Sequence, residues 1–90
     1  MTDTTFRLIE LLSAYETIGT QGGHRASVLA EEIATLSPPV GALDLAAAAV
    51  SARECALRDD QASRAATAHR LVRAGEAALE HLLAATMAPD

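Results

Sequence analysis

The chain has 90 residues and a net charge of −5, and half of its residues are hydrophobic. Because 21 of these are alanine and one is cysteine, only 23 larger apolar side chains remain, which predicts one small domain with a thin core that gains stability from a partner. The seven basic residues form no stripe, which excludes nucleic acid and an anionic membrane surface as favoured partners.

A first helix is expected over residues 5–18, where apolar side chains recur at helical spacing. Its apolar stripe consists of Leu8, Leu11, Leu12, Tyr15 and Ile18. Thr4 or Thr5 can cap the start of this helix by accepting a hydrogen bond from a free backbone N–H. Residues 19–23 contain three glycines and predict a turn, since each glycine would cost a helix interior about 1 kcal/mol relative to alanine.

A second helix is expected over residues 24–36. Its apolar face consists of Ala26, Leu29, Ala30, Ile33 and Leu36. Pro38 and Pro39 end this helix, because a proline disfavours helical geometry at the residue before it. Residues 37–41 are therefore expected to form a corner.

The rest of the chain predicts one long alanine-rich helix over residues 42–87, which contain no proline and a single glycine, Gly75. One apolar patch on it comprises Leu43, Ala46, Ala47 and Val50. A second and stronger patch comprises Ala68, Leu71, Val72, Gly75, Leu79, Leu82, Leu83 and Thr86. The absence of glycine or proline between the patches favours a continuous helix; the alternative is a break with Asp59 or Asp60 as a new N-cap.

Together these elements predict an all-α protein, a helical hairpin or small helical bundle of two short helices and one long helix, in one domain over residues 1–90. We expect it to pair with itself or with a second helical protein. The residues expected at the interface are Leu8, Leu11, Leu12, Tyr15, Ile18, Leu71, Val72, Leu79, Leu82 and Leu83. Much of each stripe must also be buried within the chain, so the share left for a partner stays open.

One face of the long helix carries His69, Arg73, Glu76 and Glu80 at spacings of four, three and four. Such a row can ligate a cation, but the preferred interpretation is an exposed face on which Arg73 pairs with one of the two glutamates. The stretch from Ala68 to Gly75 is similar to histidine phosphotransfer domains, so a phosphotransfer or ligand-binding bundle centred on His69 is an alternative. A small acidic regulator that masks a basic partner is another.

The sequence contains no recognisable catalytic, cofactor-binding or metal-binding motif, and a non-enzymatic protein without a cofactor or metal is expected. Residues 19–23 lack the preceding strand and the Lys-Ser/Thr pair of a phosphate loop. No stretch approaches eighteen uninterrupted apolar residues, so we expect no membrane-spanning helix. The first residues do not resemble a signal peptide, which predicts a cytoplasmic protein and leaves leaderless secretion open.

The corner Ser37-Pro38-Pro39-Val40-Gly41, followed by Leu45-Ala46-Ala47-Ala48-Ala49-Val50, resembles the helical-hairpin substrates of type VII secretion in actinobacteria, which include the WXG-type and PE-type proteins. The resemblance spans the chain as an architecture and implies paired helical modules, commonly heterodimers, in four-helix assemblies. The chain has no tryptophan and its only tyrosine is Tyr15, so no functional residue of that family carries over. All seven basic residues are arginine, which together with abundant alanine indicates a GC-rich, bacterial source.

Overall fold

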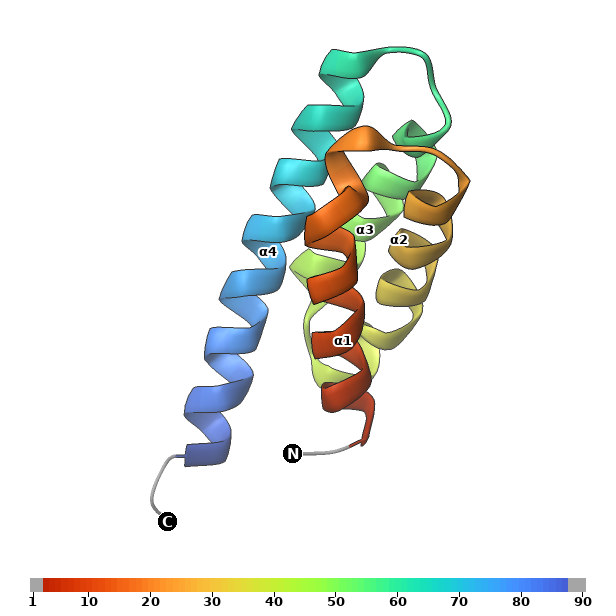
Figure 1. Ribbon diagram of the computed structural model, residues 1–90. Helices are drawn as coiled ribbons and strands as arrows, with labels where there is room; N and C mark the ends of the chain where they lie inside the picture. The colour runs from red at the N-terminus through yellow and green to blue at the C-terminus, as the bar shows by residue number, and fades with distance from the viewer. Residues whose placement is uncertain (1–2, 88–90) are drawn as a thin grey trace.

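The computed structural model describes residues 3–87, which form four α-helices joined by short turns (Figure 1). The helices are α1 (Asp3–Ile18), α2 (His24–Leu36), α3 (Leu43–Ala56) and α4 (Gln61–Met87), and two 3-10 turns are η1 (Gly19–Gln21) and η2 (Pro38–Val40). Successive helices run in opposite directions, and the molecule measures 49 × 19 × 19 Å. The described part of the chain contains no strand, so the expected all-α class is confirmed, in the form of a small helical bundle.

The turn between α1 and α2 is rich in glycine because its backbone takes conformations that other residues rarely adopt. Gly22 has φ 70° and ψ −155°, and Gly23 has φ 93° and ψ −178°, in a region that is essentially restricted to glycine. At Gly19 the reason is space, since an added Cβ would lie 2.5 Å from Cε1 of the Tyr15 ring. The predicted turn at residues 19–23 therefore has both a conformational and a steric cause.

The corner between α2 and α3 lies where the two prolines predict it. Ser37 is fully buried there, and its Oγ donates a hydrogen bond to the carbonyl oxygen of Ile33 at 2.5 Å. The Ser37 carbonyl in turn accepts a bond from the backbone N–H of Ala42 at 2.9 Å. Gly41 completes the corner in the left-handed conformation, with φ 80° and ψ 10°.

The expectation of one continuous helix over residues 42–87 is wrong, because the chain turns back between Ala56 and Gln61. Asp60 caps the new helix: its Oδ1 accepts bonds from the backbone N–H groups of Ala62 at 3.1 Å and Ser63 at 3.3 Å. The Ser63 hydroxyl donates a further bond to Asp60 Oδ2 at 2.7 Å. Hydrogen bonds from the Ser63 hydroxyl, and then from the Ser63 backbone, hold the pKa of Asp60 below its ordinary value of 3.8. The alternative given by the sequence, a break with Asp60 as the N-cap of a new helix, is therefore the arrangement that the structure shows.

The α1–α2 turn and the α3–α4 turn lie at the same end of the bundle and are hydrogen-bonded together. The backbone N–H of Gly23 donates to the carbonyl of Ala56 at 2.8 Å, which joins the α1–α2 turn to the end of α3. The Arg64 guanidinium donates to the carbonyl of Arg58 and, at 2.9 Å, to Oε1 of Gln61. Backbone and side-chain bonds together therefore close one end of the four-helix bundle.

The core compensates for its few large side chains by bringing the helices close together. Half of its fourteen buried apolar residues are alanine, whose small side chain lets two helix axes approach closely. The other half comes mainly from α1, with single large residues from the other helices. The buried apolar residues are Leu8, Leu11, Leu12, Tyr15, Ala26, Ala30, Ile33, Leu45, Ala48, Ala49, Ala52, Ala56, Ala68 and Leu71.

Tyr15 is expected to ionise only in strongly alkaline solution and to weaken the fold when it does. Burial, and then the charge of the neighbouring Cys55 thiolate, raise the pKa of Tyr15 above its ordinary value of 10.0. The stability contributed by the neutral phenol is therefore complete below pH 10 and is lost as the pH rises through the raised pKa. Because Tyr15 is the only tyrosine and the chain has no tryptophan, the ultraviolet absorbance of tyrosinate reports this group alone.

The absorbance titration should have its midpoint above 10.0 in the folded protein and near 10.0 in denaturant. In Cys55→Ala the midpoint of the folded protein should fall only part of the way, because burial is the larger cause. A midpoint of 10.0 in the native protein would contradict the burial of this phenol.

Candidate interaction surface

The structure buries half of the expected interface within the chain itself. Leu8, Leu11, Leu12 and Tyr15 on α1, and Leu71 on α4, are at most 8% exposed. These five cannot contact a partner unless the bundle opens. The partly buried members are Ile18, Val72, Leu79 and Leu82, while Leu83 is 39% exposed. The part of the expected interface that is open to a partner is therefore the C-terminal half of α4.

Two exposed side chains that the sequence did not single out as interface residues lie at the same end of the bundle. Leu43, the first residue of α3, is 68% exposed, and Phe6 in α1 is 51% exposed. The start of α1, the corner at η2 and the end of α4 all lie at this end (Figure 1). We call Phe6, Val40, Leu43, Leu82 and Leu83 the apolar end. Phe6, Leu43 and Leu83 are exposed and Val40 and Leu82 are partly exposed, and large apolar side chains left in contact with solvent are candidates for a binding surface.

The first apolar patch named from the sequence differs from the face of α3 that packs in the core. The patch of Leu43, Ala46, Ala47 and Val50 is not the buried face of α3, since Leu43 and Val50 are exposed. The buried face is instead Leu45, Ala48, Ala49, Ala52 and Ala56. Because alanine occurs on every side of this helix, the apolar spacing could not indicate which face would pack.

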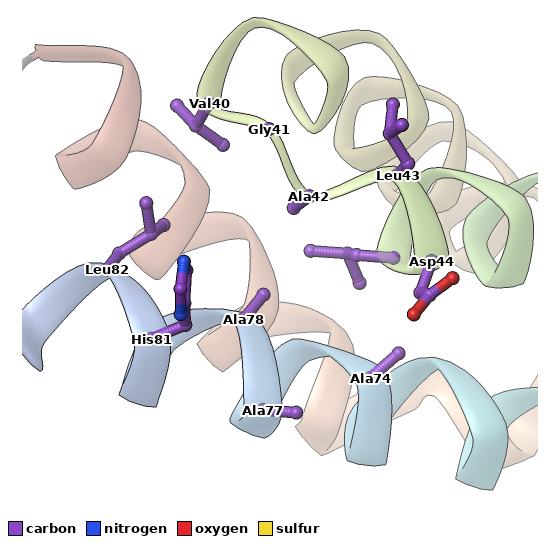
Figure 2. Close-up of a pocket in the computed structure, with 11 residues that line it drawn as sticks. Val40, Gly41, Ala42, Leu43, Asp44, Ala74, Ala77, Ala78, His81 and Leu82 are labelled. Carbon is purple, nitrogen blue, oxygen red and sulfur yellow. The ribbon is translucent and has the colours of Figure 1, made fainter. Parts of the chain in front are cut away.

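A hollow of about 200 Å³ lies within the apolar end, between α4 and the corner that leads into α3 (Figure 2). His81 and Leu82 extend from α4 towards η2, and Asp44 lies at the start of α3 on the opposite wall. The rest of the lining is mostly alanine and branched aliphatic side chains, and the polar side chains are those of His81 and Asp44. Such a hollow suits an apolar side chain of another polypeptide better than a complete small molecule, for which pockets of about 300–1,000 Å³ are usual.

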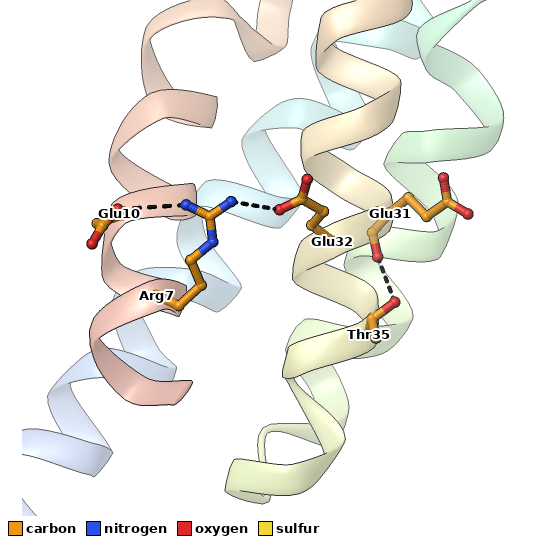
Figure 3. Close-up of polar contacts among 5 residues, drawn as sticks. All are labelled: Arg7, Glu10, Glu31, Glu32 and Thr35. Atoms are coloured by element: carbon orange, nitrogen blue, oxygen red, sulfur yellow. Dashed lines mark hydrogen bonds and ion pairs between the residues drawn. The ribbon is translucent and has the colours of Figure 1, made fainter. Parts of the chain in front are cut away.

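The charged side chains between α1 and α2 form ion pairs with each other (Figure 3). Arg7 bridges the two helices, with its guanidinium 3.0 Å from Glu32 and 3.5 Å from Glu10. Glu31 lies 3.9 Å from Arg53 of α3, and its backbone carbonyl accepts a bond from the Thr35 hydroxyl at 3.0 Å. Exposed pairs of this kind contribute about 0–1 kcal/mol each. A shallow hollow of about 450 Å³ beside them is lined by Arg7, Glu31, Glu32 and Thr35 together with the apolar Val28 and Leu36. Each of the four polar residues already has a partner among these residues or in Arg53.

The charged row of α4 faces solvent. His69, Arg73, Glu76 and Glu80 are all exposed, on the side of the helix opposite to the buried Leu71. Within residues 3–87 the structure records no ion pair between Arg73 and either glutamate, although one was expected. The charges of this row therefore remain open to another molecule.

A hollow of about 170 Å³ adjoins His69, between the end of α1 and α4, and Tyr15 and Glu16 form part of its wall. The glycine turn beside it offers no anion cradle through Gly22 and Gly23, because their N–H groups bond to Gly19 and Ala56. Among the described residues, no three His, Cys, Asp or Glu side chains lie close enough together to hold a metal ion.

Comparison of the chain with protein-family models, with curated proteins and with solved structures found no match. None of the helices described between residues 3 and 87 combines the length and apolar character needed to cross a membrane.

Proposed function

We propose that this chain is a non-enzymatic helical interaction module that works by pairing with itself or with a second helical protein. The observation that carries the proposal is the apolar end. Three of its members, Val40, Leu43 and Leu82, line a hollow, and Leu43 is 68% exposed. The substrates of type VII secretion, which the chain resembles in its corner and alanine-rich arm, are also paired helical modules, and the proposal includes that class of partner.

The physical reason for pairing is the size of the core. Seven alanines among fourteen buried apolar residues bury little area per residue, and exposed groups such as Leu43 add nothing to the stability of the isolated chain. Covering an exposed leucine side chain with another protein stabilises the complex by about 1.5–3 kcal/mol at most. Association at the apolar end therefore supplies hydrophobic burial that the monomer lacks.

Leu43→Gln should weaken association, whereas Leu57→Gln should not. The two leucines are matched, at 68% and 64% exposed, but Leu57 lies in the turn at the opposite end of the bundle. Light scattering over a concentration series should give a mass that rises above 9.3 kDa for the wild type and for Leu57→Gln, and a smaller rise for Leu43→Gln. At dilution, an apolar fluorescent dye should bind less to Leu43→Gln than to the other two proteins.

The proposal fails if the wild type stays at the monomer mass and Leu43→Gln leaves dye binding unchanged. Circular dichroism on dilute, monomeric samples provides the control for folding: neither leucine contributes to the core, so all three proteins should melt alike there.

A further inference from the structure

The outer side of α4 carries a row with heptad spacing. We call it the outer row, and it consists of Ala66, His69, Arg73, Glu76, Glu80 and Leu83, at successive spacings of three, four, three, four and three. All six residues are exposed, and the opposite side of the helix carries the buried Ala68, Leu71 and Gly75. A 3-4 spacing keeps side chains on one line along a helix, which is how two helices present a continuous seam to each other.

This seam is complementary to itself when a second α4 lies against it in the opposite direction. Place the two-fold axis between Ala74 and Gly75, and residue numbers that face each other sum to 149. Arg73 then faces Glu76 of the second copy, His69 faces Glu80, and Ala66 faces Leu83. The guanidinium of Arg73 and the imidazole of His69 thus each face a carboxylate, and the small alanine faces the large leucine. A two-fold interface requires this self-complementarity, because the same patch must serve on both copies.

A parallel arrangement lacks this match. In it Arg73 would face Arg73, and Glu76 and Glu80 would face their own copies, so three layers would bring like groups together. Like charges in direct contact destabilise an interface and select against that arrangement. The charge order along α4, with arginine in its first half and glutamate in its second, therefore favours the antiparallel pair.

We propose that α4 pairs with α4 of a second copy of this chain, antiparallel and through the outer row. The inference rests on the proposed function, namely that the chain pairs, and it adds a second contact surface whose partner is another copy of this chain, separate from the hollow of the apolar end. The outer row is accessible for this, because α4 lies at the side of the bundle and no other helix covers its outer face (Figure 1). From Ala66 to Leu83 the seam extends about 26 Å at roughly 1.5 Å per residue.

The pair is expected to be reversible and of low affinity. Its central layers are exposed ion pairs, each of which contributes little stability and is screened by salt. Only Leu83 adds a large apolar side chain to each half of the seam. The hollow of the apolar end lies on the side of α4 that faces α3, so it stays open in the pair.

Charge reversal with mixing tests the geometry. Arg73→Glu alone places a glutamate opposite Glu76 of the second copy in both symmetry-related layers, and Glu76→Arg alone places two arginines together. Each variant should dimerise about tenfold to a hundredfold more weakly than the wild type, since each substitution alters two layers at once. An equimolar mixture of the two variants should dimerise as the wild type does, because every such layer then joins a glutamate to an arginine.

The mixture is the decisive arm, because pairing between residues 73 and 76 within one chain is the same before and after mixing. Arg25→Glu and Glu54→Arg make the matched control: both residues are exposed, lie on α2 and α3, and carry the same charge changes away from the outer row. Sedimentation equilibrium at low salt measures all six samples, and the two control variants should match the wild type.

Two results would overturn the inference: a wild type that sediments as a monomer at every concentration, or a mixture that remains as weak as its components. These failures are separable from failure of the proposed function. Association that ignores the charge reversals but is weakened by Leu43→Gln removes the α4 pair and retains the apolar end as the binding surface. Association that responds to the charge reversals but is indifferent to Leu43→Gln, with dye binding also unchanged, retains the pair and removes the apolar end.

Discussion

Leu8→Ala is expected to lower the free energy of unfolding by about 2–5 kcal/mol, which is the usual loss when a buried leucine is cut back to alanine. Leu8 is 0% exposed and belongs to the core stripe of α1. The cavity left by its side chain would therefore be enclosed by protein on all sides and not open to solvent. A domain of this size has a total stability of about 5–13 kcal/mol, and the variant should therefore lose a large share of it. Urea unfolding followed by circular dichroism measures the change.

Phe6→Ala is the matched control, since Phe6 lies two residues earlier in the same helix and is 51% exposed. It removes a larger side chain but should cost about 1 kcal/mol or less, because much of that side chain is already in water. Equal losses in the two variants would contradict the orientation of α1 in the bundle.

Gly22→Ala is expected to lower the free energy of unfolding by about 2–4 kcal/mol, for two reasons that add. The backbone conformation of Gly22 is nearly restricted to glycine, and a side chain there costs about 1–3 kcal/mol in strain. The added Cβ would also lie 2.8 Å from the carbonyl oxygen of Ala56 and would contact the side chain of Arg64. The carbonyl of Ala56 is the acceptor that fastens Gly23 to the end of α3, so the substitution acts on the closed end of the bundle.

Gly23→Ala and Gly41→Ala separate the two reasons. Gly23 has a similar backbone conformation but no atom within 4 Å of an added Cβ, and Gly41 is in the milder left-handed region and is equally open. Thermal unfolding should rank the losses as Gly22→Ala, then Gly23→Ala, then Gly41→Ala. If Gly22→Ala were no worse than Gly23→Ala, the crowding at Ala56 would be absent.

The sequence predicted those parts of the fold for which one local signal dominates. The helix at residues 24–36 has the expected bounds, since glycines precede it and two prolines follow it. The first helix ends at the expected Ile18 but begins at Asp3, so Thr4 and Thr5 lie inside its first turn.

The break before α4 was harder to predict because its signal is a side chain that can act in two ways. Asp60 is compatible with a surface position in a long helix and with an N-cap, and only the packing of α4 against α3 decides between them. The same packing selects the buried face of α3, where alanine on all sides gives no local preference.

The candidate surface was predictable only in its C-terminal part. Leu82 and Leu83 were expected at an interface, and they lie at the apolar end together with Phe6 and Leu43, which were not. The signal for Leu43 was available in principle, because it is out of step with Leu45, Ala48 and Ala52. It becomes readable only once the buried face of α3 is known.

The two ends of the bundle should also differ in how often they open. At one end Gly23 is bonded to Ala56, and Asp60 holds the first turn of α4, whereas the last described turns of α4 are mostly exposed. Local unfolding therefore starts from the far end of α4, and its backbone amides should exchange hydrogen with solvent much faster than those around the buried Leu71. The C-terminal turns of α4, which open most readily, lie next to the apolar end. A partner bound at the apolar end should therefore be detected first as slower hydrogen exchange of the backbone amides in these turns.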